Sequence, residues 1–254
     1  MAPLTPQSAT GHGITYQDPL MVSHAEVPTE MDGIAVDGRP ADCVKLAIAS
    51  LWEERFGRGS RPDLVISGMN AGANCGINVI YSGTVAAAIE AAFLGIGSIA
   101  VSLHLGRGKP RFDVAAWHAR RTIERLLAGG SIGAHTCLNV NIPRCEEAEW
   151  VAPSPDTTFQ SRTGQSVGTD LEESLEIEVC PMNTHGIIDR FERRESPAGQ
   201  GVLLGGGGGL DFHATDEGTD VERMMARRIT VTPLQFDLTD HMGLHLWRSR
   251  LGGG

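Results

Sequence analysis

The stretch DLVISGMNAGANCGINVIYSGTVAAAIEAAFLG, residues Asp63–Gly95, joins a short apolar run, a loop of glycines and small polar residues, and an alanine-rich segment. The apolar run ends at Gly68 and predicts a strand that is buried on both faces. The alanine-rich segment predicts a helix that begins at Thr84 and stops at Gly95. Ligands of open α/β sheets bind in loops at the carboxyl ends of strands, so we expect this glycine-rich loop to line a site.

The flanking segments continue the alternation of strands and helices. Strands are expected at GIAVDG, SIAVSL and CLNVNIP, which are residues 33–38, 98–103 and 137–143. A helix should begin near Pro40, and another should be capped by Asp113 and end at Gly129. The first of these helices should bury one stripe, made of Val44, Ala47, Ile48 and Leu51. This order predicts an α/β fold with a parallel sheet covered by helices on both faces.

The pattern becomes irregular after Pro143. Residues 144–228 are acidic and predict a β-hairpin-rich excursion, and the glycine run at residues 205–209 is typical of a linker, because no Lys-Ser/Thr closes it. Residues 211–220 are predicted to form a solvated loop near the site. We therefore divide the chain into an α/β core at 1–143, the excursion at 144–228, and a final core strand with a C-terminal helix at 229–254.

Composition excludes several classes of protein. The net charge of −10 disfavours a polynucleotide partner, and no apolar run approaches the roughly 18 residues that a membrane span requires. The five cysteines form no CxxC pair, so they predict free thiols in a reducing cytoplasm rather than disulfides or a zinc site.

The SGT tripeptide lies where the loop enters the predicted helix. Backbone N–H groups at a helix start lack intrahelical partners, so Ser82, Gly83 and Thr84 could bind a phosphate without a lysine. The simpler interpretation is that Ser82 or Thr84 only caps the helix. Sequence alone leaves both interpretations open.

Two asparagines, Asn70 and Asn74, lie between the strand and the tripeptide. Amide oxygens are suitable ligands for Mg²⁺ or Mn²⁺, although asparagines also tolerate the turn geometry of a glycine-rich loop. The glycine spacing is GxxxGxxxG rather than GxGxxG, and no GxSxG is present, so neither a dinucleotide site nor a serine hydrolase is indicated.

The stretch from Pro62 to Leu103 closely resembles the most diagnostic segment of the SurE family, the stationary-phase survival proteins that act as nucleotide phosphatases. The segments APLTPQSATGHGIT, DGRPADCV, LNVNIP and DEGTDVERMMARRITVTPLQFDLT resemble further family segments in the same order. The resemblance implies a Rossmann-like core that hydrolyses nucleoside 5′-monophosphates with a divalent cation. It also implies possible action on 3′-nucleotides and short polyphosphate, and a cytoplasmic homodimer or homotetramer in which the C-terminal helix embraces a neighbour.

The resemblance also assigns candidate site residues. Ser8 and Asn70 match family metal ligands, and the phosphate-facing positions fall on Asn74, Ser82, Gly83 and Thr84. His12 lies in the Ser8 loop, where it could contact the substrate or protonate the leaving group; a loop histidine bonded to backbone is the alternative.

One part of the family pattern, the NDDG motif that supplies two further metal ligands, is absent from the sequence, as is any adjacent Asp-Asp pair. We expect either that the natural protein is longer, with a GTG valine codon taken as the start at Met1, or that the chain is an N-truncated, inactive nucleotide or phosphate binder. The undamaged downstream motifs favour the first explanation. A missing core strand should leave a sheet edge unpaired.

Overall fold

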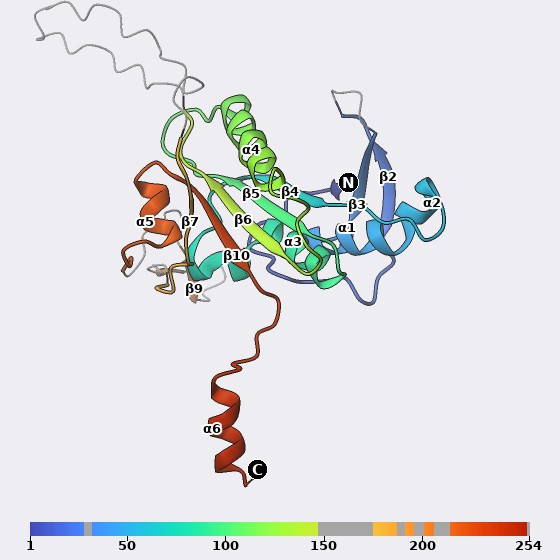
Figure 1. The fold of residues 1–254 in the computed structure, drawn as a ribbon. Coiled ribbons are helices and arrows are strands. Elements are labelled where there is room, and N and C mark those ends of the chain that lie inside the picture. Colours follow the sequence, from blue (N-terminus) through green and yellow to red (C-terminus); the bar gives the residue numbers. More distant parts are fainter. Residues whose placement is uncertain (28–31, 147–174, 187–190, 196–200, 206–213, 253–254) are drawn as a thin grey trace, which may run out of the picture.

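The computed structural model describes residues 1–27, 32–146, 175–186, 191–195, 201–205 and 214–252. Its main sheet has five strands in the order β4-β5-β6-β10-β7 (Figure 1). The strands β4 (Val65–Ala71), β5 (Ser98–Leu103) and β6 (Cys137–Ile142) are parallel. β10 (Ile229–Leu234) runs antiparallel to β6, and β7 (Ile177–Val179) is parallel to β10. The predicted α/β fold with a mostly parallel sheet is confirmed.

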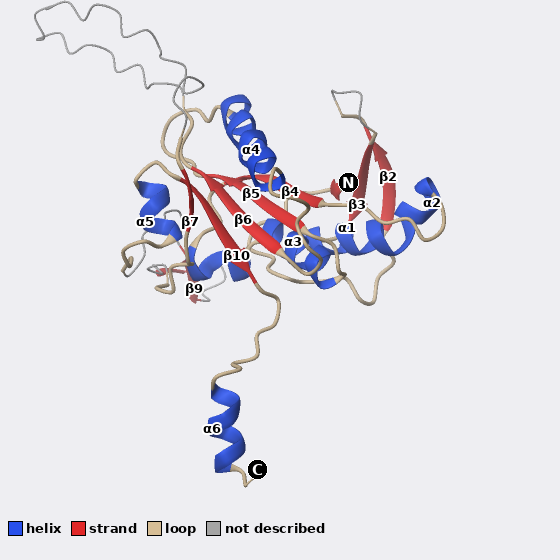
Figure 2. Ribbon diagram, viewed as in Figure 1, coloured by secondary structure: helices blue, strands red, loops and turns tan. Residues whose placement is uncertain are grey.

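Helices cover both faces of this sheet, as predicted (Figure 2). Alternate residues of β5 point to opposite faces, because side chains along a strand alternate in direction. Ile99 and Val101 pack with α4 (Phe112–Leu127), whereas Ala100 packs with α3 (Gly83–Phe93). All six residues of β5 are buried, so this strand lies at the centre of the core.

The N-terminal region forms a separate three-stranded sheet in the order β1-β3-β2. β1 (Ala2–Pro3) is parallel to β3 (Gly33–Asp37), and β2 (Met21–Ala25) is antiparallel to it. The predicted helix after β3 is present as α1 (Pro40–Leu46), a π-helical turn (Ala47–Leu51) and α2 (Trp52–Phe56) in succession. The four residues expected to form its buried stripe are only half-buried; the buried residues are Ala41, Asp42 and Cys43.

Two expectations about element ends and burial were wrong. β4 is an edge strand within the described residues. None of its residues is fully buried and Ile66 is 51% exposed, so the strand is not buried on both faces. Asp113 does not cap α4. The helix begins one residue earlier, and the Asp113 carboxylate instead accepts hydrogen bonds from Arg111 at 2.6 and 2.9 Å.

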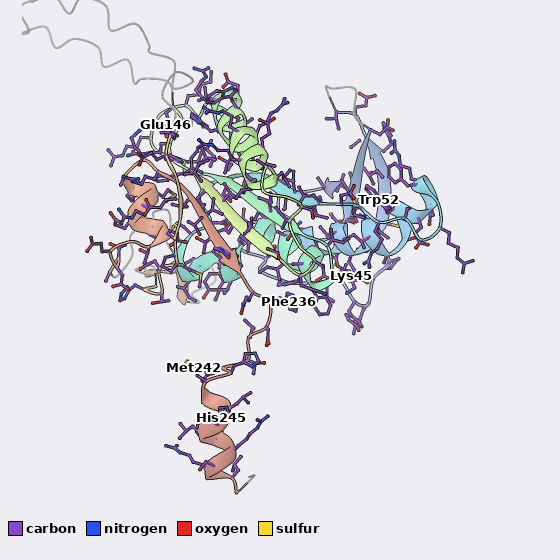
Figure 3. The ribbon with its side chains drawn as sticks, viewed as in Figure 1. Lys45, Trp52, Glu146, Phe236, Met242 and His245 are labelled. Atoms are coloured by element: carbon purple, nitrogen blue, oxygen red, sulfur yellow. The ribbon has the colours of Figure 1, made fainter. Side chains whose placement is uncertain are left out.

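The remaining elements follow the core strands. β8 (Phe191–Glu195) and β9 (Gly201–Gly205) form an antiparallel pair, and α5 (Asp220–Met225) precedes β10. Residues 206–209 of the glycine run lie outside the described residues. The predicted C-terminal helix is α6 (Gly243–Arg250), which extends away from the core with Met242 and His245 (Figure 3). Among the described helices, none is long and apolar enough to cross a membrane.

Candidate functional site

The end of β4 and the start of α3 are joined by Asn70. Its side-chain amide donates to the Gly72 carbonyl at 2.7 Å, and its Oδ1 accepts a hydrogen bond from the Thr84 hydroxyl at 3.2 Å. The Asn70 side chain is thereby fixed with its oxygen towards the first turn of the helix. The structure thus brings together one proposed metal ligand and one proposed phosphate residue.

Ser82 caps α3. Its hydroxyl oxygen accepts a hydrogen bond from the Val85 N–H at 3.1 Å, and the residue is only 8% exposed. The capping interpretation is therefore confirmed for Ser82, although the hydroxyl hydrogen remains available to a further acceptor. A phosphate role for the same group stays a prediction.

Gly83 is required by close packing. A Cβ on this residue would lie 2.8 Å from Cγ of Pro40 and 3.1 Å from the Thr10 hydroxyl oxygen. The Thr10 hydroxyl is buried and has no hydrogen-bond partner among the described residues. The start of α3 thus lies directly against the loop that carries Ser8.

This N-terminal loop is anchored to the residues before α3. The Gly11 N–H donates to the Tyr81 carbonyl at 2.9 Å, and both Ala9 and Gly11 have positive φ angles, of 53° and 56°. Ser8 is exposed. No hydrogen bond of the described residues joins Ser8 to Asn70, so a cation shared by these two residues stays a prediction.

His12 is bonded to a side chain rather than to backbone. Its Nε2 lies 2.7 Å from Oε2 of Glu90, which is 4% exposed on α3. Lys45 of α1 approaches the other oxygen of Glu90 at 3.3 Å. The imidazole therefore ties the N-terminal loop to α3 through a buried carboxylate, and a substrate contact for His12 stays a prediction.

Asn74 is held by residues of β5 and β6 that were predicted as strand residues but not as site residues. Its side-chain amide donates to the Ser102 hydroxyl at 2.7 Å, and its backbone is bonded by Asn139 and Asn141 of β6. One signal was available in the sequence: LNVNIP places two asparagines two residues apart in an otherwise apolar strand, and therefore on one face.

Asp220 is a second group that sequence reasoning missed. The solvated loop expected at residues 211–220 is wrong for this residue, which is completely buried. Its carboxylate accepts the Gly76 N–H at 2.8 Å and the Asn183 N–H at 2.9 Å. Burial raises the pKa of Asp220 above its ordinary value, although these backbone hydrogen bonds oppose the shift.

Asp220 should make stability depend on pH. The folded protein holds this proton more tightly than the unfolded chain, so Asp220 contributes stability that is fully present below its ordinary pKa of 3.8 and is lost as pH rises through the raised value. The free energy of unfolding of the wild type, relative to Asp220→Asn, should therefore fall as pH increases above about 4. Urea unfolding of both proteins between pH 4 and 7 measures this difference.

Asp113→Asn provides a matched control for that experiment. The Arg111 side chain lowers the pKa of the exposed Asp113 to about 2, so this residue is ionised throughout the range. The difference in free energy of unfolding between Asp113→Asn and the wild type should stay constant above about pH 5. If the free energies of unfolding of Asp220→Asn and the wild type changed in parallel with pH, Asp220 would not be a buried acid with a raised pKa.

The candidate metal ligands do not by themselves fit a divalent cation. Ser8 and Asn70 are neutral oxygen donors, and Mg²⁺ and Mn²⁺ sites normally include carboxylates. Within the part of the chain that the structure describes, no group of three or more His, Cys, Asp or Glu side chains could hold a metal ion. Nearby Asp42 is engaged elsewhere, because it accepts hydrogen bonds from Thr15 and from the Arg39 N–H.

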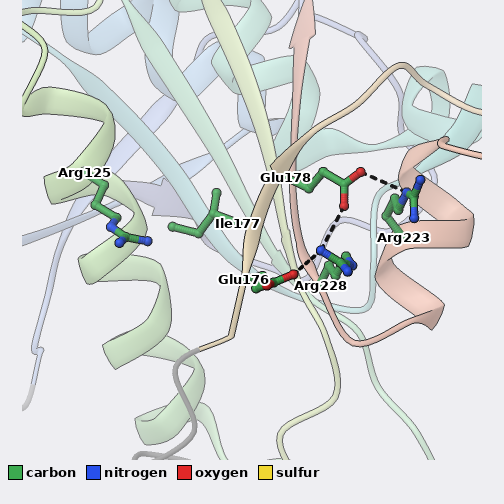
Figure 4. Close-up of a pocket in the computed structure, with 6 residues that line it drawn as sticks. All are labelled: Arg125, Glu176, Ile177, Glu178, Arg223 and Arg228. Atoms are coloured by element: carbon green, nitrogen blue, oxygen red, sulfur yellow. Dashed lines mark hydrogen bonds and ion pairs between the residues drawn. The ribbon is translucent and has the colours of Figure 1, made fainter.

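A cavity of about 480 Å³ is lined by none of the candidate site residues (Figure 4). It is lined by Arg125, Glu176, Ile177, Glu178, Arg223 and Arg228. Glu178 pairs with Arg223 at 2.9 Å and with Arg228 at 3.4 Å, and Arg228 also pairs with Glu176. The paired carboxylates neutralise these two arginines, so we assign the cavity to an ion-pair network that links β7 to α5.

The family described as Survival protein SurE matches residues 1–165. A protein from Heliobacterium modesticaldum named 5′-nucleotidase SurE is 38% identical over 257 residues, covering 100% of this chain and 82% of its own. A protein of the same name from Variovorax paradoxus is 37% identical over 263 residues, covering 99% of this chain and 87% of its own.

A solved structure gives the same result for the fold. The crystal structure of the SurE protein from Aquifex aeolicus superimposes with a TM-score of 0.72 at 30% identity, over 98% of this chain and 86% of that one. The family match covers more than half of the chain, and the relatives align with nearly all of it. This chain therefore belongs to the SurE family.

Proposed function

We propose that the protein hydrolyses nucleoside 5′-monophosphates to nucleoside and phosphate, as a 5′-nucleotidase, when carboxylate ligands complete its cation site. The observation that carries the proposal is the contact between Asn70, at the carboxyl end of β4, and Thr84, in the first turn of α3. This contact places amide and hydroxyl groups at a helix N-terminus, which favours an anion. Two relatives named 5′-nucleotidase SurE support the choice of reaction.

The phosphate would be bound by the start of α3 and by the loop before it. The Ser82 hydroxyl and the backbone N–H groups of Gly83 and Thr84 would face it, together with the Asn74 side-chain amide, which retains one N–H after bonding Ser102. His12, on the N-terminal loop that carries Ser8, would contact the substrate from the other side. We extend the proposed substrates to 3′-nucleotides and short polyphosphate, because this site would recognise a phosphate rather than a base.

A divalent cation, Mg²⁺ or Mn²⁺, belongs to the proposal, with Ser8 and Asn70 as two of its ligands. When bound, such a cation neutralises charge on the phosphoryl group and activates water. Because these two donors are neutral, the proposal requires carboxylate ligands in addition to them. The role proposed for the described residues is to bind the phosphate monoester and to orient it at the start of α3.

A second function is favoured by the neutral donor set. Without carboxylates beside Asn70 and Ser8, the chain would bind a nucleotide or phosphate without hydrolysing it. No described cluster of acidic, histidine or cysteine side chains supplies that charge, which is the observation in favour of this alternative.

One experiment separates the two functions. AMP binding is measured by calorimetry, and phosphate release from AMP is measured with Mn²⁺ or EDTA, for the 254-residue chain and for the same chain carrying an N-terminal Asp-Asp segment of a SurE relative. We expect both proteins to bind AMP and the second to show strong Mn²⁺-dependent turnover. Binding without turnover in both supports the non-catalytic alternative, and turnover that resists EDTA contradicts a metal-dependent reaction.

We further propose that the protein is a cytoplasmic homodimer or homotetramer in which α6 packs on a neighbouring subunit. The arm that carries α6 exposes large apolar side chains, among them Leu238 (94%), Met242 (90%) and Leu251 (85%), and such exposure is typical of an interaction surface. All five cysteines are buried and none of them forms a disulfide, which supports a reducing compartment.

A further inference from the structure

We propose that Asn139 and Asn141 are positioning residues that hold Asn74 in the geometry required to bind phosphate. The proposal rests on the function proposed above, in which Asn74 faces the phosphate. The two asparagines lie two residues apart on β6, so both side chains leave the same face of the sheet, the face covered by α3.

Asn141 binds the backbone of Asn74 as a neighbouring strand would. Its Oδ1 accepts the Asn74 N–H at 2.8 Å, and its Nδ2 donates to the Asn74 carbonyl at 2.9 Å. A side-chain amide has the same donor and acceptor as a peptide group, so this pair of bonds satisfies both backbone groups of Asn74 at once. Asn141 is completely buried, which excludes water as a competing partner.

Asn139 adds a third bond to the same residue. Its Nδ2 donates to the Asn74 carbonyl at 2.7 Å, so that one carbonyl accepts two side-chain amides. Asn139 is also completely buried. A carbonyl oxygen has two lone pairs, and this arrangement uses both.

The side chain of Asn74 is oriented from the adjacent strand. Ser102 of β5 lies opposite Asn141 in the register of the sheet, and its hydroxyl oxygen accepts a hydrogen bond from the Asn74 amide at 2.7 Å. Neighbouring positions on two strands therefore fix both the backbone and the side chain of Asn74. The remaining N–H of its amide is left to face a ligand.

The rest of the loop is held at its two flanks. The Gly72 N–H donates to the Leu103 carbonyl at 2.9 Å, and the Gly76 N–H donates to Asp220 at 2.8 Å. Asn74 lies midway between these points, so the bonds from β6 decide its position within a segment whose ends are already tied. A glycine-rich loop needs such bonds, because its backbone has many accessible conformations.

The test uses the full chain with Asn141→Ala, Asn139→Ala, Asn74→Ala and the double variant Asn74→Ala/Asn141→Ala. Hydrogen–deuterium exchange measures how well the backbone N–H of Asn74 is protected, and calorimetry measures the affinity for inorganic phosphate. Asn183→Ala is the matched control: Asn183 is equally buried, and its amide also donates to backbone carbonyls, but to those of His185 and Ala214.

Asn141→Ala should speed exchange of the backbone N–H of Asn74 about tenfold, because it removes the acceptor of that N–H. It should also weaken phosphate binding about tenfold, because Asn74 is then no longer held in place. Asn139→Ala should have a smaller effect on exchange, since it leaves the Asn74 N–H bonded. The double variant should bind phosphate no more weakly than Asn74→Ala alone, because a positioning residue acts only through the group it positions. Asn183→Ala should lower stability and leave both measurements unchanged.

The proposal is overturned if Asn141→Ala matches the wild type in exchange or in phosphate affinity, or if Asn183→Ala weakens phosphate binding equally. Phosphate binding that survives Asn74→Ala would refute the phosphate role given to Asn74 in the proposed function, while the exchange rates would still decide whether β6 holds its backbone. A wild-type chain that binds no phosphate would overturn both.

Discussion

The Gly68→Ala variant is expected to lose about 2–5 kcal/mol of its free energy of unfolding. Gly68 has a φ of 123°, which L side chains rarely adopt, and a Cβ there would lie 2.3 Å from the Val101 carbonyl oxygen. The backbone conformation costs about 1–2 kcal/mol and the displacement of a packed neighbour about 1–3 kcal/mol. Urea unfolding followed by circular dichroism measures the loss, and failure to fold is its extreme form.

Gly57→Ala isolates the first of these costs, that of the backbone conformation. Gly57 also has a positive φ, of 99°, but a Cβ there meets nothing within 4 Å. This variant should show only the backbone cost of about 1–2 kcal/mol. Equal losses for the two variants would mean that the end of β4 does not approach β5 as closely as the structure has it.

The close approach at Gly68 bears on function because it lies two residues before Asn70. The register between β4 and β5 shifts between Ser67 and Asn70, so the strand changes its path just where the site begins. A glycine lets the two backbones meet at this shift, and Asn70 then extends towards α3.

Asn70→Ala is expected to lower kcat/KM for AMP about a hundredfold. The substitution is made in the protein that carries the N-terminal Asp-Asp segment, which is the one expected to hydrolyse AMP. In the proposed function the Asn70 amide oxygen is both a cation ligand and the acceptor for Thr84, so alanine removes one ligand and frees the hydroxyl at the helix start. Initial rates of phosphate release at saturating Mn²⁺ measure the effect. A thermal unfolding curve close to that of the wild type would show that the loss lies in the site.

Asn78→Ala is the control for this prediction. Asn78 lies in the 3₁₀ helix Gly76–Tyr81 of the same motif, and its side-chain nitrogen has no hydrogen-bond partner among the described residues. It should retain the activity of the wild type. Full activity in Asn70→Ala, or an equal loss in Asn78→Ala, would contradict the role given to Asn70.

The elements of the core could be predicted because their signals are local. SIAVSL combines four apolar residues with two small serines and forms β5, buried at every position, and the alanine-rich segment after Ser82 forms α3. The exposure of β4 could not be predicted in this way, because burial of a strand depends on which neighbours pair with it. The misplaced cap at Asp113 reflects a different limit: Arg111 offers that carboxylate a stronger partner than backbone N–H groups.

The site was predictable only where one motif contains both partners. Asn70 and Thr84 are 14 residues apart within the quoted stretch, and they are in contact. Asp220 bonds Gly76 across 144 residues, and His12 meets Glu90 across 78, so no local pattern could pair them. The asparagines of β6 were visible as polar positions in an apolar strand, but their partner in the loop was not.

The shared carboxylate of Glu90 has a consequence for the order in which the molecule assembles. His12 and Lys45 reach it from segments 78 and 45 residues away, so neither finds this partner until α3 has docked. Closing such long loops is entropically costly and comes after the local contacts have formed. The residues around Ser8 therefore acquire their anchor late, and a nascent chain completes its N-terminal segment only after later-synthesised parts have folded.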